Sequence, residues 1–151
     1  MISRSIKVFM GLLFTLVLTG CIGESYDFNP PAAELSGDRM IEPQELEQGA
    51  IDWRGENNEP VKKEETDMKS IADGQQPMNF GTGEKAELLF SHADFDTEEL
   101  SVSLWRNGTQ TALDVNDISF TMPDDPGEYV LEVNLRTDRG NVQYIGKVVI
   151  S

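Results

Sequence analysis

The strongest constraint on the fold is an alternation of apolar and polar residues near the end of the chain. In the segment 129–136, the residues Tyr, Leu, Val and Leu alternate with Val, Glu, Asn and Arg; the segment 144–150 follows a turn at 138–141 and alternates less strictly. A period of two residues places every second side chain on the same face of an extended strand. The two segments therefore predict an antiparallel hairpin with one face toward a core.

Other parts of the chain carry the same strand signal. The segments with this alternation are 86–90, 100–104 and 118–122, with briefer patterns at 33–35 and 40–41 on either side of a turn at 36–38. Asn107-Gly108 separates Trp105-Arg106 from Thr109-Gln110-Thr111. This pair readily adopts positive φ at both residues, so it predicts a two-residue hairpin turn.

The stretch Asp125-Pro126-Gly127-Glu128-Tyr129 places a turn directly before the Tyr that begins a long strand. This arrangement is similar to the tyrosine corner of immunoglobulin-like domains, in which the phenol hydroxyl binds the preceding loop. Many short strands with little helix and no internal repeat also indicate such a fold. We therefore predict an all-β chain that forms a single immunoglobulin-like antiparallel β-sandwich.

The first 20 residues have the pattern of a secretory signal peptide: a short basic region precedes an apolar run over 8–18, which is too short to span a membrane. The run ends in a sequence that resembles a bacterial lipobox, Leu18-Thr19-Gly20-Cys21. Lipoprotein-processing enzymes would cleave before Cys21 and attach diacylglycerol and a fatty acid to it. This predicts a lipid anchor at the outer face of the cytoplasmic membrane; the alternative is an ordinary signal peptide with an incidental cysteine.

The remaining organisation follows from composition. We predict a signal peptide at 1–20, a lipidated tether at 21–30, and the β-sandwich at 31–151, interrupted by a polar loop at 54–76. The polar loop contains few large apolar residues and cannot bury much surface. Within it, one or two helical turns are expected at 67–72, because the apolar residues there fall on one face.

Charge and cysteine content exclude several classes of function. The chain has 27 acidic and 12 basic residues, and cleavage of the signal peptide removes Arg4 and Lys7, which leaves 27 acidic and 10 basic residues, a net charge of −17. A chain this acidic is a poor ligand for nucleic acid. Cys21 is the single cysteine, so its lipidation would leave no thiol for a disulfide, a metal-thiolate site or a nucleophile.

Five short features occur in order between Pro30 and Ser151. They are Pro30-Pro31, Gly49-Ala50-Ile51-Asp52-Trp53, a variable polar segment, Ser101-Val102-Ser103-Leu104-Trp105, and the closing Gly127-Glu128-Tyr129 with Gln143-Tyr144. In this order they resemble a family of small lipoproteins and membrane-attached ectodomains of low-GC Gram-positive bacteria. Relatives often carry an aromatic residue or a cysteine before the first Trp, where this chain has Ile51-Asp52, so no cross-link or redox role is carried over. The family supplies no catalytic residue.

Two acidic stretches are weak candidates for calcium. The first surrounds His92 and includes Asp94 and Asp96; the second contains Asp114, Asn116 and Asp117, similar to the calcium linkers of cadherins. Carboxylate and amide oxygens are suitable calcium ligands, but the first stretch lacks the glycine and terminal glutamate of an EF-hand. Solvated loops and turns explain both stretches without a metal, so we predict no metal site and no cofactor other than the lipid.

The two tryptophans are candidate partner-binding residues. The apolar residues of the strand that contains Trp105 are at positions 100, 102 and 104, so Trp105 falls on the opposite face, away from the predicted core. It is either exposed or covered by the 54–76 segment. Trp53 is a second candidate. No motif places a nucleophile, a base and an orienting group together, so we predict that the protein is not an enzyme.

The sequence thus predicts a membrane-anchored extracytoplasmic lipoprotein that serves as a non-catalytic binding or accessory module. Its expected partners are the membrane and an envelope protein or glycan. The alternatives are a structural or protective acidic surface protein, and a calcium-binding β-sandwich module.

Overall fold

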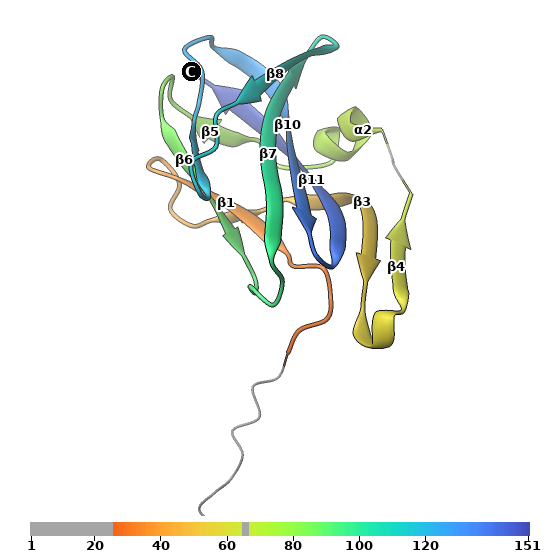
Figure 1. The fold of residues 1–151 in the computed structure, drawn as a ribbon. Coiled ribbons are helices and arrows are strands. Elements are labelled where there is room, and N and C mark those ends of the chain that lie inside the picture. Colours follow the sequence, from red (N-terminus) through yellow and green to blue (C-terminus); the bar gives the residue numbers. More distant parts are fainter. Residues whose placement is uncertain (1–25, 65–66) are drawn as a thin grey trace, which may run out of the picture.

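A computed structural model describes residues 26–64 and 67–151, which form two β-sheets packed face to face (Figure 1). The larger sheet has the strand order β4-β3-β11-β10-β7-β8, and β5 also pairs with β11. Its strands are β3 (Glu47–Arg54), β4 (Pro60–Lys63), β5 (Met78–Phe80), β7 (Thr97–Arg106), β8 (Thr109–Leu113), β10 (Gly127–Thr137) and β11 (Gly140–Ile150). The smaller sheet has the order β2-β1-β6-β9. Its strands are β1 (Ala33–Gly37), β2 (Gln44–Glu45), β6 (Lys85–Phe90) and β9 (Ser119–Thr121).

The predicted all-β sandwich is confirmed. Apart from the parallel pair β5 and β11, the strand pairs are antiparallel. The core lies between the sheets, where the inward residues of each strand are buried. Its largest fully buried side chains include Trp53, Tyr144, Phe80, Leu35, Leu88, Leu104, Leu131 and Leu135. Burial of this apolar surface supplies the main favourable term in folding.

The central strands are divided between the two sheets. β7, β10 and β11 lie side by side in one sheet, while β6 and β9 pair in the other. The predicted tyrosine corner is present, because the hydroxyl of Tyr129 donates a hydrogen bond of 2.7 Å to the carbonyl oxygen of Asp125. Burial raises the pKa of the Tyr129 phenol.

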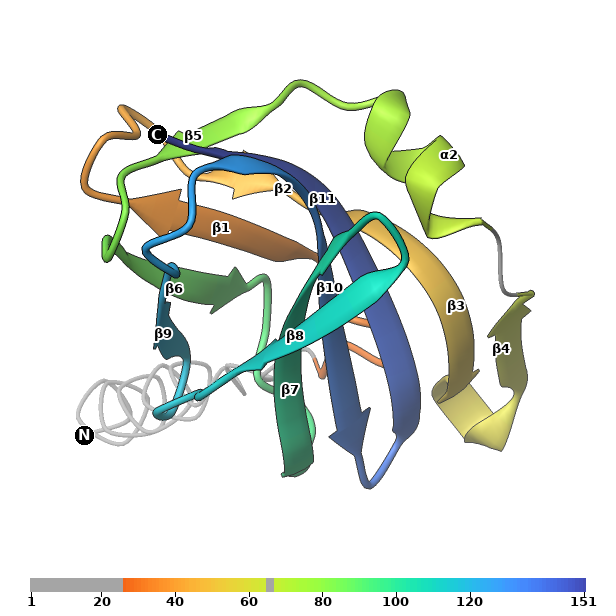
Figure 2. The same cartoon turned by 90° about the horizontal axis from the view of Figure 1, so that it is seen from above.

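Both predicted hairpins are present (Figure 2). Asn107 and Gly108 join β7 to β8 with φ values of 52° and 76°, which is the two-residue turn expected from this dipeptide. β10 and β11 pair over their full length, from Gly127 with Ile150 to Thr137 with Gly140. This pairing fixes which side chains of the two strands share a face.

Several sequence-based boundaries were wrong. The predicted strand at 40–41 is absent, and the chain instead pairs with β1 through β2 at Gln44–Glu45. The 54–76 segment is not a simple loop, because β4 pairs with β3 and a short 3-10 helix, Glu56–Asn58, precedes β4. The helix expected at 67–72 is present as α2 (Met68–Asp73), and the Asp67 side chain caps it by accepting a hydrogen bond from Lys69 N. Backbone pairing along an edge needs no apolar alternation, so β2 and β4 leave little signal in the sequence.

Residues 26–30, assigned from the sequence to the lipidated tether, are held against the sandwich. The carbonyl oxygen of Phe28 accepts a hydrogen bond of 3.0 Å from Trp53 Nε1, and that of Asn29 lies 2.8 Å from His92 Nε2. The Arg139 guanidinium stacks on the segment, 5.2 Å from the Phe28 ring centroid and 5.7 Å from that of Tyr26. Contacts with the sandwich therefore extend to Tyr26, the first described residue.

Candidate functional site

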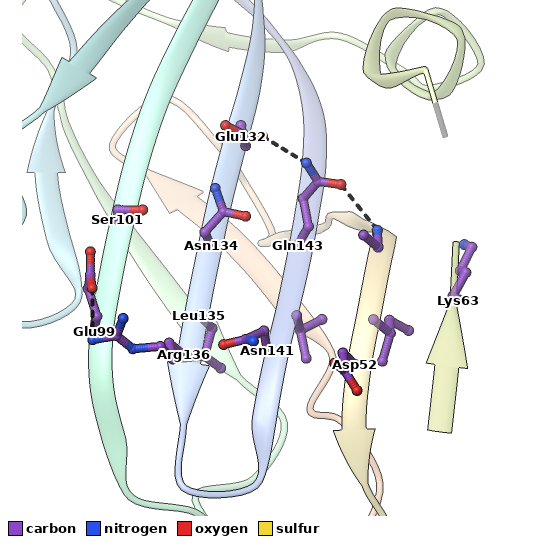
Figure 3. A pocket seen from close by; sticks show the side chains of 13 residues that line it. Asp52, Lys63, Glu99, Ser101, Glu132, Asn134, Leu135, Arg136, Asn141 and Gln143 are labelled. Atoms are coloured by element: carbon purple, nitrogen blue, oxygen red, sulfur yellow. Dashed lines mark hydrogen bonds and ion pairs between the residues drawn. The ribbon is translucent and has the colours of Figure 1, made fainter. Parts of the chain in front are cut away.

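A polar groove lies on the outer face of the larger sheet and has a volume of about 570 Å³ (Figure 3). It crosses β3, β11, β10 and β7. Its lining residues are Ala50, Ile51, Asp52, Lys63, Glu99, Ser101, Glu132, Asn134, Leu135, Arg136, Asn141, Val142 and Gln143. The lining residues come from β3, β4, β7 and the β10–β11 hairpin, so the sheet pairing brings together segments that are distant in the sequence.

The alternation along β10 explains why this face is polar. Leu131, Val133 and Leu135 point into the core and are at most 1% exposed. The residues between them, including Glu132 and Asn134, therefore project from the opposite face. The groove therefore lies on the face of β10 opposite to the apolar residues that identified the strand.

A buried hydrogen-bond network forms the floor of the groove. Gln143 Nε2 donates a hydrogen bond of 2.7 Å to Glu132 Oε2, and Gln143 Oε1 accepts one of 3.1 Å from the backbone nitrogen of Ala50. Trp105 Nε1 donates to Glu132 Oε1 at 3.3 Å. Glu132 and Gln143 are only 8% and 7% exposed. The network therefore satisfies buried polar atoms and fixes the Glu132 carboxylate in one orientation.

Other polar side chains of the groove are available for contacts. In Figure 3, no hydrogen bond joins Ser101, Asn134 or Asn141 to any of the other residues drawn. An ion pair lies at one end of the groove, where Arg136 Nη2 is 3.1 Å from Glu99 Oε2. The floor is thus rigid, whereas the residues above it present hydroxyl and amide groups that can donate and accept hydrogen bonds.

Trp105 is half-buried at the boundary between this network and a second hollow of about 430 Å³. The 54–76 segment flanks it, because Met68 and Ala72 of α2 line the same hollow. Gln75 Nε2 donates a hydrogen bond of 2.9 Å to the carbonyl oxygen of Ile145, which ties the end of α2 to β11. The aromatic side chain therefore lies against a fixed helix and presents part of its surface to solvent.

Within α2, one side-chain pair stabilises the helix surface. Lys69 Nζ donates a hydrogen bond of 2.8 Å to Asp73 Oδ2 one turn later. This hydrogen bond raises the pKa of Lys69 and lowers the pKa of Asp73. The pair places one charge of each sign beside the hollow.

Trp53 is not a surface residue, so its candidacy as a partner-binding residue was wrong. Its side chain is 1% exposed, and the ring packs edge-on against Phe95 with the centroids 6.0 Å apart. Its indole nitrogen donates to Phe28, as described above. Trp53 therefore belongs to the core and to the attachment of the amino-terminal segment.

The first calcium candidate also holds the amino-terminal segment. Asp94 Oδ2 accepts a hydrogen bond of 2.8 Å from the backbone nitrogen of Asp27, and His92 Nδ1 accepts one of 3.2 Å from the backbone nitrogen of Asp94. Asp96 N donates to Asp138 Oδ1 at 2.8 Å. The acidic loop is thus ordered by contacts with the chain itself.

The second calcium candidate forms a tight turn. Asn116 N donates a hydrogen bond of 2.8 Å to the carbonyl oxygen of Ser119, and Asp117 has a φ of 59°. Asp114 precedes this turn and is exposed. Over residues 26–64 and 67–151, no group of three or more His, Cys, Asp or Glu side chains is placed to hold a metal ion.

Sequence reasoning missed the two central residues of the groove, Glu132 and Gln143. Their polar character was visible, but it indicates only a solvent-facing position. The missing information was the register of β10 and β11, which places Gln143 opposite Asn134 and diagonal to Glu132. The two-residue turn at Asp138-Arg139 sets this register. Had the sequence identified these two turn residues, it would have placed Glu132 and Gln143 close together.

The lipobox residues Leu18, Thr19, Gly20 and Cys21 lie outside the described residues. Within the described part of the chain, no helix is long and apolar enough to cross a membrane. No protein-family model matches this chain, and no curated protein sequence matches it.

Proposed function

We propose that the protein is a lipid-anchored, extracytoplasmic binding module that holds an envelope protein or glycan in the groove of its larger sheet, without catalysis. The observation that carries this proposal is the buried Trp105–Glu132–Gln143 network. Burial of a carboxylate and an amide on the outer face of a sheet is unfavourable unless their hydrogen bonds are satisfied. A rigid polar floor below exposed hydroxyl and amide groups is typical of a preorganised recognition surface.

The small number of residues between Cys21 and Tyr26 supports a position close to the membrane. If Cys21 carries lipid, only residues 22–25 separate it from Tyr26, the first residue seen in contact with the sandwich. Fully extended, the five Cα–Cα steps from Cys21 to Tyr26 span about 17 Å. The domain would therefore stay at the bilayer surface, within reach of other envelope components.

The single histidine argues for a non-catalytic role. Both of its ring nitrogens are engaged, Nε2 with the carbonyl oxygen of Asn29 and Nδ1 with the backbone of Asp94. A general base must be free to take a proton from a reacting group. His92 instead serves to position the amino-terminal segment.

The anchor and the groove require separate tests. For the anchor, cells are fed a fatty-acid analogue, which is expected to label the wild type and not Cys21→Ser. Equal labelling of the two proteins would refute the lipid anchor.

For the groove, a photo-crosslinking residue replaces Asn134, and a control chain carries it at Ile41, which is fully exposed and lies outside the groove. We expect one discrete envelope product at position 134 and none at position 41. The same products at both positions, or none at position 134, would reject the groove and favour the acidic surface protein.

A further inference from the structure

The outer strands of the two sheets differ in how they are protected from pairing with another chain. The outer strands are β4, β8 and β5, which pairs only with β11, in the larger sheet, and β2 and β9 in the smaller one. An outer strand presents unpaired backbone N–H and C=O groups, which form a template for a further strand. Natural sheets usually block such edges with proline, lysine, other charges or short strands.

Four of the five edges carry such protection. β4 begins with Pro60 and ends with Lys62-Lys63, and the Lys63 ammonium donates a hydrogen bond to the carbonyl oxygen of Gln48. β2 has only two residues, one of them Glu45, and β5 and β9 have only three each. Each of these edges is therefore a poor template for a further strand.

β8 has none of this protection. Its five residues, Thr109–Leu113, contain no charge, proline or glycine, and the first four are exposed. Two of them are threonines, which favour the extended conformation. The chain contains 27 acidic and 12 basic residues, so an exposed outer strand without any charge stands out. This strand is the candidate for pairing with another chain.

The hairpin register shows which backbone groups are free. Arg106 pairs with Thr109 next to the two-residue turn, and Leu104 pairs with Thr111. Pairs that exchange hydrogen bonds alternate with pairs that do not, and the pair next to a two-residue turn is of the bonded kind. The backbone groups of Gln110 and Ala112 therefore point away from β7, toward the open edge. The Gln110 side chain bonds to Ser103 Oγ at 3.0 Å on the outer face of the sheet, which leaves its backbone accessible.

We propose that the edge of β8 binds an extended segment of another protein, which adds to the larger sheet as a further strand. Main-chain hydrogen bonds to Gln110 and Ala112 would supply the affinity. On the inner side, the added segment would meet Thr111 and the half-buried Leu113, so β-branched or apolar side chains fit there. The strongly acidic chain favours a segment that is uncharged or basic.

A second copy of this chain does not fit as the occupant. The amino-terminal segment is attached at the end of the sandwich where β7 begins, through Asp94, and β8 runs back toward that end (Figure 1). Antiparallel pairing of β8 with itself requires a two-fold axis normal to the sheet, which places the two amino-terminal ends at opposite ends of the dimer. Given the proposed anchor at Cys21, both copies could not enter one membrane.

The test uses the full chain in detergent micelles and an acetylated, amidated peptide, Thr-Lys-Val-Thr-Val-Lys-Thr, as the probe. Its Val and Thr residues favour extension, and its lysines complement the acidic protein. On peptide addition, amide hydrogen exchange at Gln110 and Ala112 is expected to slow by about tenfold or more. Exchange at Thr111, whose amide already pairs with β7, should change little. Unchanged exchange at Gln110 and Ala112 under saturating peptide would overturn the proposal.

Two variants at one position supply matched controls. Ala112→Pro removes an outward N–H without removing a hydrogen bond to β7, and is expected to weaken peptide binding about tenfold or more while leaving the melting temperature nearly unchanged. Ala112→Val retains the N–H and should bind as the wild type does. If Ala112→Pro binds the peptide as tightly as the wild type does, the proposed binding at the edge of β8 is refuted. If the wild type is a dimer that Ala112→Pro dissociates, the segment that pairs with β8 is a second copy of this chain. Asn134→Arg, which alters the groove alone, should leave peptide binding unchanged, so failure of the groove and failure of the edge are distinguishable.

Discussion

The hydroxyl of Tyr144 donates a hydrogen bond of 2.6 Å to the carbonyl oxygen of Pro31, which lies 113 residues earlier in the chain. Gln48 Nε2 donates to the same oxygen at 3.0 Å. Tyr144 itself is fully buried in β11. The last strand thus fixes the position at which the chain enters the sandwich.

Removal of this hydroxyl should destabilise the fold moderately. Tyr144→Phe retains the packing of the ring, and Pro31 still accepts a hydrogen bond from Gln48, so the free energy of unfolding is expected to fall by about 1 kcal/mol. Urea denaturation measures this change. Thr109→Ser, at an exposed site far from this contact, is the control and should change stability by less than about 0.5 kcal/mol. A Tyr144→Phe protein as stable as the wild type would show that the contact contributes nothing.

The same residue predicts a loss of stability at alkaline pH. Burial raises the pKa of Tyr144 well above its ordinary value, which is near 10. Between these two values the native state keeps a proton that the unfolded state loses, so the free energy of unfolding falls as the pH rises above about 10. Tyr144→Phe should show a weaker alkaline decline in a denaturation series over pH. Parallel curves for the two proteins would contradict the assignment.

Two glycines in hairpin turns should respond very differently to alanine. At Gly140, φ is 135°, and a Cβ would overlap the carbonyl oxygen of Asp52 and lie 2.9 Å from Trp53 Cα. Gly140→Ala is expected to reduce the free energy of unfolding by more than about 3 kcal/mol. Gly108 has a φ of 76° and open space around it, so Gly108→Ala should reduce it by only about 1 kcal/mol. Thermal or urea unfolding of both variants checks the ranking, and a reversed order would contradict the close approach of β3 and β11.

The attachment of the amino-terminal segment should depend on Trp53. Trp53→Phe retains an aromatic ring in the core but removes the donor to the carbonyl oxygen of Phe28. Limited proteolysis with chymotrypsin should therefore cleave after Tyr26 or Phe28 faster in this variant than in the wild type. Trp105→Phe, on the other face of the sheet, is the matched control and should not change this rate. Equal cleavage of all three proteins would show that other contacts alone hold the segment.

The groove network should respond to the loss of its carboxylate. Glu132→Leu leaves Gln143 Nε2 and Trp105 Nε1 without their acceptor, and the free energy of unfolding is expected to fall by about 1–3 kcal/mol. The fluorescence emission of Trp105 should shift at the same time, because its indole nitrogen loses a charged partner. Glu34→Leu, an exposed position in β1 of the smaller sheet, is the control. A Glu132→Leu protein with unchanged emission would show that the network does not include Trp105.

The sequence was sufficient for features whose cause is local. Alternation along β10 and β11 and the Asn107-Gly108 turn each act within a few residues, so the central hairpins could be predicted. β3 could not, because a register shift between Val142 and Tyr144 accompanies its pairing and interrupts the alternation. Trp53 and Trp105 show the same difference between local and non-local causes. The alternation along 100–104 placed Trp105 on the outer face, whereas the burial of Trp53 depends on β3, a strand that could not be predicted from the sequence.

The attachment of residues 26–31 also determines how the domain would carry mechanical load. Under the proposed anchor, any pull from the bilayer enters the fold at Tyr26. The contacts that resist it come from β3, β11, the 91–94 loop and the turn at Asp138-Arg139, through Trp53, Tyr144, Asp94 and Arg139. Because these contacts come from several strands and loops, a force applied there would be shared among them and would not unzip a single strand.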